Sequence, residues 1–387
     1  MKIGIDARKI LNPEKGDDIG VGHYTFQLIR HLLEIDKDNE YVLFFDFRVR
    51  EKDVRKFNQP NVKIKFYPFS DYKKYLPGAY SEILGTATLS KEKLDVLHTT
   101  SPTSRVPLSY RGQTIVTIHD LASYSFPEAF PKISTAKYKT TLNFMVKKAE
   151  RIITVSESTK NDLCRHFHCP AGKIKVIYGG VDKRFFNPAS IPREKVFERY
   201  AISGKKYALF LGTLEPIKNI SRLFEAFKIF RDRLQKERGQ CEYSLVMAGK
   251  RGWLAKEYKR MAKDMGIGKD IVFTGYVIGD EIVSLFANAD FFVLPSLYEG
   301  FGSTVLEAFA TGTPAILSNV ASIPEIAGEA AKLVNPLDVK EIAEAMLEFA
   351  ENEEIKNSYR EKGKEQVKKF NWEKTARETL EVYKSLK

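Results

Sequence analysis

The stretch Pro295-Ser-Leu-Tyr-Glu-Gly-Phe-Gly-Ser-Thr-Val-Leu-Glu-Ala-Phe-Ala-Thr-Gly-Thr-Pro314 says most about the fold of this chain. An apolar run, Phe291 to Leu294, precedes it and predicts a buried strand. A glycine-rich turn follows, and a helix is expected to open near Ser303. Backbone N–H groups and the positive end of the helix dipole converge at such a helix start. The stretch therefore predicts an anion site, with phosphate as its natural occupant.

Two glutamates flank this turn, Glu299 before the glycines and Glu307 on the first helical turns, with seven residues between them. A carboxylate repels a phosphate because both are negatively charged, but it accepts hydrogen bonds from sugar hydroxyls. A site that holds both groups indicates a nucleotide-sugar. The competing interpretation is a tight strand–helix turn with solvated glutamates, and it would be preferred if Gly300-Phe-Gly302 stood alone.

Length and composition limit the class of protein. The chain has 387 residues, which favours two domains, and 43% of them are hydrophobic, enough for well-filled cores. It has no run of about 18 apolar residues, so no transmembrane helix is expected. The first six residues predict a strand and lack a signal-peptide core. Three cysteines are too few and too scattered to form a disulfide framework, so we expect the protein in the reducing cytoplasm.

The net charge of +12 is unevenly distributed. Residues 1–190 carry +10 and residues 191–387 carry +2. A basic first half predicts an anionic partner. An acidic membrane surface or a phosphorylated acceptor fits better than nucleic acid, because no known nucleic-acid-binding pattern is present.

Short β-branched runs alternate with amphipathic stretches, which predicts parallel sheets covered by helices. Proline, asparagine and serine cluster at residues 187–193, so we place a domain boundary there. The expected parts are domains 1–190 and 191–370 and a C-terminal helix within 371–387. The expected strands are residues 2–6, 41–45, 62–66, 95–98, 114–119, 151–155, 173–177, 207–211, 243–248, 271–273, 291–294, 314–317 and 331–333.

Two motifs of the first half follow expected strands, at the edge where open α/β sheets bind ligands. A loop ending in Gly20-Val21-Gly22-His23-Tyr24 precedes a helix, and its glycines would let the backbone approach a diphosphate. His119 and Asp120 end another strand, where the imidazole would contact a sugar hydroxyl or transfer a proton. A histidine packed in the core explains that position equally well.

Basic residues follow two strands of the second half. Lys218, five residues after Thr213, is placed to neutralise a diphosphate just before a helix start. A second basic pair, Lys250 and Arg251, follows the next strand. A lone lysine at a helix start is usually solvated, but two basic sites at equivalent strand ends favour an anionic ligand.

Residues 133–149 predict an amphipathic helix with Leu142 and Met145 on its apolar face. Its opposite side carries a phenylalanine among lysines, a pattern that suits an anionic membrane or a lipid-linked acceptor. The alternative is that this side covers a loop of the protein. The residues concerned are Lys137, Phe144, Lys147 and Lys148.

Together these motifs resemble the retaining glycosyltransferases of family 4. That family has the GT-B architecture, an α/β fold of two facing Rossmann-like doubly wound domains with an interdomain cleft. The similarity covers nearly the whole chain, and its strongest part is the pair Glu299 and Glu307. Three motifs are similar to the mannosyltransferase-like branch that builds cell-surface polysaccharides. They are Gly4-Ile-Asp-Ala-Arg8, Gly212-Thr-Leu-Glu-Pro216 and Ser318-Asn-Val-Ala-Ser322.

The resemblance implies a role for each site residue. Glu307 would hold the donor ribose, Glu299 the transferred sugar and Lys218 the diphosphate. Many members carry arginine where this chain has Thr213, and Lys250 or Arg251 would replace that contact. The implied catalytic residues are His119, Glu299 and Lys218. The implied donor-binding residues are Gly20, Val21, Gly22, Asp120, Thr213, Lys218, Lys250, Arg251, Tyr276, Val277, Glu299, Gly300, Phe301, Gly302, Ser303, Thr304 and Glu307, and no metal site is implied.

The implied activity is retaining, metal-independent transfer of a hexose from a nucleotide-sugar to a saccharide or lipid-linked acceptor, with no cofactor. Only the similarity to that branch favours GDP-mannose over UDP-sugars. The competing functions are a sugar-nucleotide epimerase of the same two-domain architecture and a non-catalytic protein that binds an anionic membrane. The expected location is the cytoplasm, with peripheral association at the inner face of the plasma membrane as a further option.

Overall fold

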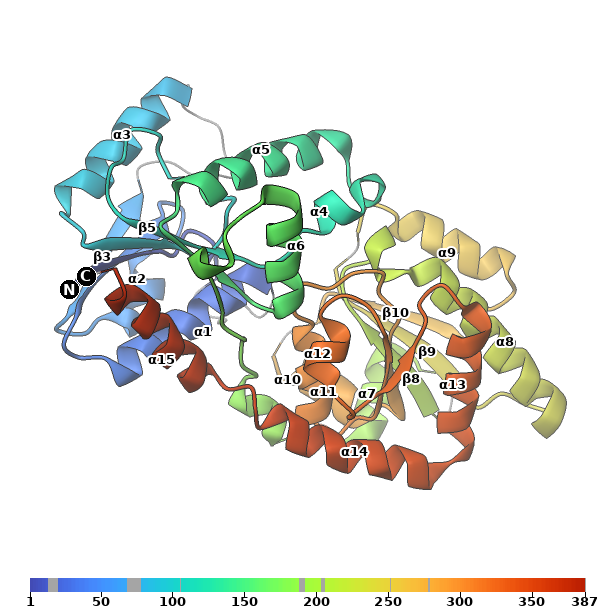
Figure 1. The fold of residues 1–387 in the computed structure, drawn as a ribbon. Helices are drawn as coiled ribbons and strands as arrows, with labels where there is room; N and C mark the ends of the chain where they lie inside the picture. Colours follow the sequence, from blue (N-terminus) through green and yellow to red (C-terminus); the bar gives the residue numbers. More distant parts are fainter. Residues whose placement is uncertain are drawn as a thin grey trace. The chain divides into compact units, whose positions relative to one another are not determined.

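The structure, a computed structural model, divides the chain into two compact units. The first unit is Met1–Pro127, Pro131–Gly179 and Asn371–Lys387, and the second is Glu128–Phe130 and Gly180–Phe370 (Figure 1). The residues described are 1–12, 20–67, 78–104, 106–187, 192–202, 206–250, 252–277 and 279–386.

The first unit contains a parallel sheet with the strand order β3-β2-β1-β4-β5-β6-β7. Its strands are β1 (Lys2–Asp6), β2 (Glu40–Asp46), β3 (Val62–Tyr67), β4 (Val96–Thr99), β5 (Thr114–Ile118), β6 (Arg151–Thr154) and β7 (Ile174–Val176). Its helices are α1 (Gly20–Ile35), α2 (Glu51–Val54), α3 (Gly78–Lys91), α4 (Ala122–Ser125), α5 (Lys132–Lys148), α6 (Glu157–Phe167) and α15 (Trp372–Lys384). Its short 3-10 turns are η2 (Arg55–Phe57) and η4 (Ala171–Lys173), whereas η3 (Pro127–Ala129) has one residue in the first unit and two in the second.

Helices cover both faces of this sheet. Successive residues of a strand point to opposite sides of the sheet, so neighbouring residues contact different helices. Leu97 on β4 belongs to a buried hydrophobic cluster with Leu142 and Met145 of α5. The next residue, His98, bonds through Nδ1 to the hydroxyl of Tyr383 on α15, at 2.7 Å. Helices α1 and α15 lie side by side (Figure 1). The last helix of the chain thus completes the core of the first unit.

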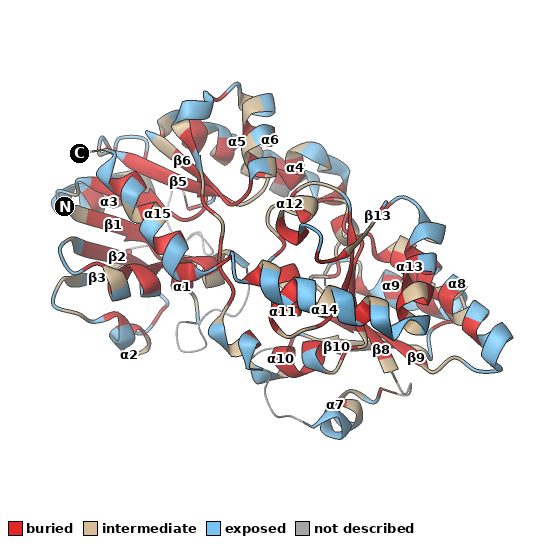
Figure 2. Cartoon of the chain, turned by 60° about the horizontal axis from the view of Figure 1, so that its bottom comes forward, coloured by how far each residue is buried: buried red, intermediate tan, exposed pale blue. Residues whose placement is uncertain are grey.

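The second unit contains a parallel sheet with the strand order β10-β9-β8-β11-β12-β13. Figure 2 shows its strands buried and its helices exposed on their outer sides. The strands are β8 (Lys206–Leu211), β9 (Tyr243–Ala248), β10 (Ile271–Gly275), β11 (Phe291–Leu294), β12 (Ala315–Ser318) and β13 (Lys332–Val334). The helices and 3-10 turns are η5 (Lys183–Phe186), α7 (Arg193–Tyr200), η6 (Pro216–Lys218), α8 (Ile220–Arg238), α9 (Ala255–Asp264), α10 (Asp280–Ala287), α11 (Ser303–Ala310), α12 (Ile323–Ala327), α13 (Val339–Glu351) and α14 (Glu353–Val367).

The expected fold class is confirmed, since both units are doubly wound parallel α/β structures. Every strand predicted from the sequence is present, with ends that differ by at most two residues. One local expectation is corrected. Gly20, Val21 and Gly22 form the first turn of α1 and not the loop before it. The residues before Gly20 in that loop, 13–19, lie outside the described part of the chain.

Candidate functional site

The turn between β11 and α11 has the geometry expected of an anion site. Gly302 caps α11 with φ of +83°, a left-handed conformation that L side chains rarely adopt. A Cβ at this position would lie 2.9 Å from Ile323 Cδ1, so the end of the isoleucine side chain would also have to move. Ser303 is exposed and Thr304 half-buried on the first turn of α11. Val305 N donates to Gly302 O at 3.0 Å, whereas the backbone N–H groups of Ser303 and Thr304, the first two of the helix, have no acceptor one helical turn earlier and can bind an anion.

Glu299 and Lys218, which are 81 residues apart in sequence, form an ion pair at 2.5 Å between Oε1 and Nζ. Their strands, β11 and β8, are neighbours in the sheet, so the two loops meet at the same edge. Ser296 donates a second hydrogen bond to Glu299 Oε1, at 2.8 Å. Ser322 donates to the main-chain oxygen of Glu299, at 2.9 Å. The carboxylate is therefore held in one place beside a cation.

Asn219 holds the loop that carries Lys218, and sequence reasoning assigned it no role. It is 4% exposed and adopts φ of +59° between η6 and α8. Its side-chain amide donates to the main-chain oxygens of Pro295, at 3.0 Å, and Pro336, at 2.6 Å. The sequence did hold a signal for this residue: it lies between a proline-containing turn and a helix start. A left-handed backbone is common at such a junction, and asparagine tolerates that conformation better than most residues.

Two glycines, Gly249 and Gly252, let the loops after β8 and β9 approach each other closely. Gly249 has φ of +137°, and a Cβ there would lie 2.0 Å from the main-chain oxygen of Gly212. A Cβ at Gly252 would lie 1.9 Å from the main-chain oxygen of Leu214. Leu214 N donates to Lys250 O at 3.1 Å. This backbone-to-backbone packing sets the course of the loop that leads to Lys218.

The remaining candidates of the second unit differ in exposure. The Lys250 ammonium lies 5.0 Å from the ring centroid of Tyr276, which is 48% exposed. Val277 is buried, so its side chain cannot border a ligand, although its main chain can. Glu307 and Thr213 are half-buried. Arg251 lies outside the described residues. Gly300 and Phe301 are half-buried, and the Phe301 ring packs against Phe370.

In the first unit, His119 follows β5 and is partly accessible to solvent. Its Nε2 lies 2.8 Å from the main-chain oxygen of Thr100, and its ring packs edge-on against Tyr24. Close packing around the imidazole lowers the pKa of His119 to about 4. Asp120 accepts a hydrogen bond from Ala122 N through Oδ1, at 3.0 Å. His119 is thus anchored by the core on one side and accessible on another.

The residues expected to meet a membrane divide into two kinds. Lys137 and Lys147 are exposed on α5. Phe144 is partly buried and packs against the hydrophobic core, and Lys148 donates to Tyr110 O at 2.6 Å. The phenylalanine and one lysine of this group therefore serve the unit's own packing.

Across the described ranges, no helix combines the length and apolarity needed to cross a membrane. Within those same ranges, no group of three or more histidine, cysteine, aspartate or glutamate side chains is arranged to hold a metal ion.

Two family models match the chain. The model "Glycosyltransferase Family 4" matches residues 19–185, and the model "Glycosyl transferases group 1" matches residues 192–366. O-antigen chain mannosyltransferase B of Escherichia coli is 31% identical over 274 residues, which are 71% of this chain and 71% of that protein. O-antigen chain mannosyltransferase RfbU of Salmonella typhimurium is 30% identical over 235 residues, 61% of this chain and 60% of that protein.

Solved structures share the fold. Alr3699/HepE of Anabaena, determined in complex with UDP and glucose, superimposes with a TM-score of 0.75 at 16% identity, covering 100% of both chains.

Proposed function

This chain belongs to glycosyltransferase family 4, and on that premise we propose that it moves a hexose from a nucleotide-sugar to a saccharide or lipid-linked acceptor in the synthesis of a cell-surface glycan. The observation that carries this proposal is the Lys218–Glu299 pair beside the N-terminus of α11. A cation and N–H groups that suit a diphosphate lie next to a fixed carboxylate that suits a sugar hydroxyl.

The proposed chemistry breaks the bond between the anomeric carbon and the diphosphate and forms a bond from that carbon to an acceptor oxygen. Negative charge grows on the departing diphosphate, where Lys218 and the first N–H groups of α11 stabilise it. The acceptor proton passes to the departing phosphate oxygen. Attack on the face that the leaving group vacates retains the anomeric configuration, and no step in this scheme needs a metal ion.

We assign the donor as GDP-mannose, with UDP-sugars as the competing class. The support for mannose is that both E. coli mannosyltransferase B and RfbU of S. typhimurium are named for that sugar. The support for uridine is the UDP-bound HepE structure, which is more distant in sequence. In this proposal Glu307 accepts hydrogen bonds from the ribose hydroxyls, and the backbone at Tyr276 and Val277 borders the base.

We further propose that residues 191–370 bind the donor and that residues 1–190, with the helix within 371–387, bind the acceptor. His119 contributes a contact to the transferred sugar from the first unit. Gly20, Val21 and Gly22 at the start of α1 offer backbone N–H groups to the diphosphate.

The test is a melting screen of the purified chain against GDP, UDP and ADP and their mannose, glucose and N-acetylglucosamine conjugates. A ligand that binds only the folded state raises Tm, so one nucleotide family should stabilise the protein. Glu307→Ala should abolish most of that shift because it leaves ribose hydroxyls unpaired. Glu329→Ala, at an exposed position after α12, should keep it. No shift with any ligand contradicts the proposal.

We also propose that the first unit binds an anionic membrane where a lipid-linked acceptor resides. The support is the charge of +10 on residues 1–190 together with the exposed side of α5, where Ile133 is 86% exposed and Lys137 and Lys147 are exposed. A basic helix face with a protruding apolar residue suits an acidic lipid surface.

Co-sedimentation with phosphatidylglycerol vesicles at moderate salt checks this association. Replacing Lys132, Lys137 and Lys147 with glutamine should release most of the bound protein, since each basic residue near an anionic surface contributes about 1 kcal/mol. The matched control replaces three exposed lysines in and just after α14, Lys362, Lys368 and Lys369, and should bind as the unaltered chain does. If both triple variants lose vesicle binding equally, or if the unaltered chain does not bind vesicles at all, α5 is not the membrane contact.

A further inference from the structure

Asn219 lies between the turn that carries Lys218 and the start of α8, but its side chain does not cap that helix. Asparagine is a common N-cap residue, because its side-chain oxygen accepts a hydrogen bond from an N–H group of the first helical turn. In the described part of the chain no such bond is formed, and the backbone of Asn219 is left-handed, with φ of +59° and ψ of 37°. The start of a helix therefore does not explain the direction of this amide.

Both polar atoms of the Asn219 amide bond to other segments. Its Nδ2 donates to the main-chain oxygens of Pro295, at 3.0 Å, and Pro336, at 2.6 Å. Its Oδ1 accepts from Nη1 of Arg222, at 3.0 Å. Carbonyl oxygens only accept hydrogen bonds and a guanidinium only donates them, so the amide cannot be reversed. One side chain thus joins the loops after β8, β11 and β13 in a single arrangement.

The turn that carries Lys218 depends on contacts of this kind. Lys218 ends η6, a turn of three residues, and its long side chain has several rotatable bonds. Such a turn alone does not fix the position of an ammonium. Leu297 N donates to Ile217 O, at 2.8 Å, which is a second bond between this turn and the loop after β11. Asn219 and Leu297 together hold the turn against the loop that carries Glu299.

The same loop fixes the partner of the lysine. Ser296, next to Pro295, donates to Glu299 Oε1 at 2.8 Å, and that oxygen also receives the Lys218 ammonium, at 2.5 Å. A shift of η6 relative to this loop would lengthen the ion pair and move the ammonium away from the first N–H groups of α11. The Asn219 amide spans the two parts whose relative position decides this geometry.

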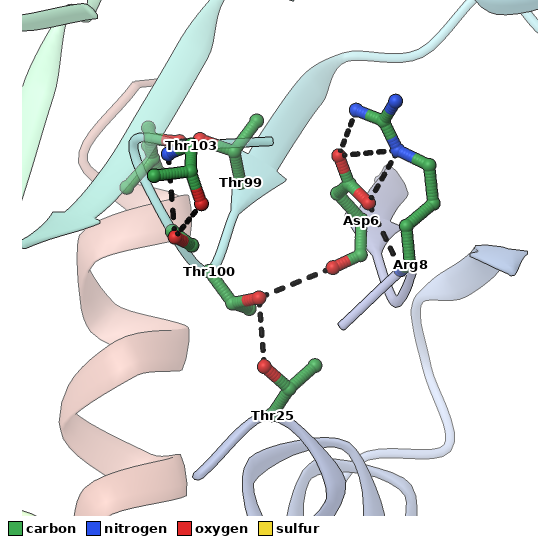
Figure 3. A network of polar contacts seen from close by, with 8 residues as sticks. Asp6, Arg8, Thr25, Thr99, Thr100 and Thr103 are labelled. Atoms are coloured by element: carbon green, nitrogen blue, oxygen red, sulfur yellow. Dashed lines mark hydrogen bonds and ion pairs between the residues drawn. The ribbon is translucent and has the colours of Figure 1, made fainter. Parts of the chain in front are cut away.

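The first sheet has a comparable connection at the carboxyl edge of its strands (Figure 3). The Thr100 hydroxyl, just after β4, donates to the main-chain oxygen of Asp6 at the end of β1, at 3.2 Å, and bonds to the Thr25 hydroxyl of α1, at 2.8 Å. Such bonds fix strand ends relative to one another, and by themselves they indicate stability. Asn219 differs because its chain neighbour is Lys218, so the position of an ammonium depends on it.

Building on the proposed function, we infer that Asn219 is a positioning residue for Lys218, whose ammonium it places where the charge of the departing diphosphate develops. Lys218 contacts the diphosphate, and Asn219 acts only through Lys218. A displacement of about 1 Å in a group of this kind can lower the rate by about 10²-fold. Loss of the amide should therefore lower turnover although no group that touches the donor has been removed.

Two variants separate positioning from general stability. Asn219→Gly isolates the amide, since glycine adopts the left-handed backbone without strain. The matched control is Thr313→Val. Thr313 is 3% exposed and its hydroxyl donates to the main-chain oxygen of Phe286, at 2.7 Å, but it precedes β12 and so lies at the opposite edge of the same sheet. Both variants remove a buried bond to the main chain and should lower Tm, whereas Asn219→Gly alone should alter the site.

The first test needs no donor. Hydrogen–deuterium exchange of the full chain reports how often the amide of Leu297 separates from Ile217 O. Asn219→Gly should speed exchange in residues 295–298 by about tenfold, because two buried hydrogen bonds between the loops are lost. Thr313→Val should leave exchange in that segment unchanged. An unchanged rate in Asn219→Gly overturns the inference whatever the protein binds.

The second test is a double-mutant cycle on kcat/KM for donor turnover. Asn219→Gly should lower kcat/KM about tenfold to 100-fold, and Thr313→Val should keep it. Asn219→Gly combined with Lys218→Ala should match Lys218→Ala alone within about twofold, because the amide acts only through the lysine. Losses that multiply in the double variant contradict the inference while leaving the proposed function in place. Absence of turnover with every nucleotide-sugar removes the proposed function and this inference together.

Discussion

Lys218→Ala is expected to lower kcat/KM for the release of nucleoside diphosphate by about 10²- to 10³-fold, the range found when one preorganised group that stabilises developing charge is removed. The side chain is 20% exposed and lies against Glu299, so its ammonium acts in partly desolvated surroundings where charge is poorly screened. The measurement is steady-state turnover of the donor that the melting screen identifies.

The matched control is Lys228→Ala. Lys228 lies on α8 in the same unit and is also paired with a carboxylate, Asp232, but it is 41% exposed. It should change kcat/KM less than twofold. If Lys218→Ala behaves like this control while its Tm is unchanged, the lysine does not contact the diphosphate.

Part of the loss in Lys218→Ala comes from Glu299, which keeps its bond to Ser296 but loses its cation. An unpaired carboxylate near the diphosphate repels it. Adding Glu299→Gln to Lys218→Ala should therefore recover some donor affinity relative to the single variant, although the sugar contact of Glu299 is weakened. Such non-additivity is expected of residues in direct contact.

Gly249→Ala is expected to destabilise the second unit by about 3 kcal/mol or more, since it combines an unfavourable backbone conformation with a collision. The new Cβ would lie 2.0 Å from the main-chain oxygen of Gly212, and neither backbone segment can move without breaking the hydrogen bonds between β8 and β9. Urea unfolding followed by a probe in the second unit measures the change.

Gly239→Ala separates the two causes. Gly239 ends α8 with φ of +75°, and a Cβ there would meet nothing within 4 Å. Gly239→Ala shares the positive φ with Gly249→Ala but not the collision, so it should lower the free energy of unfolding by only about 1 kcal/mol. Similar losses at both positions would mean that the loops after β8 and β9 can separate at little cost.

Strand positions could be predicted because the central strands of both sheets are buried on both faces and therefore form short apolar runs in the sequence. Phe291 to Leu294 and Tyr243 to Ala248 are examples in which every residue is buried. The tight turn before α11 could be predicted as well, since Gly302 occupies a conformation that other residues avoid. The predicted start of α1, after Tyr24, is five residues late, because Gly20 and Gly22 favour a loop locally while the helix takes them into its first turn.

The amino-acid pattern thus sufficed for the order of strands and helices along the chain, the α/β class and the glycine-rich turn before α11, because burial period and backbone conformation are local properties. It did not reveal that Glu299 lies against Lys218, that Asn219 ties three segments together, or that the Thr100 carbonyl lies 2.8 Å from His119 Nε2. Those contacts depend on which strands are neighbours and on main-chain atoms that every residue shares. Their identity emerges only when the sheet is assembled and its loops are brought to a common edge.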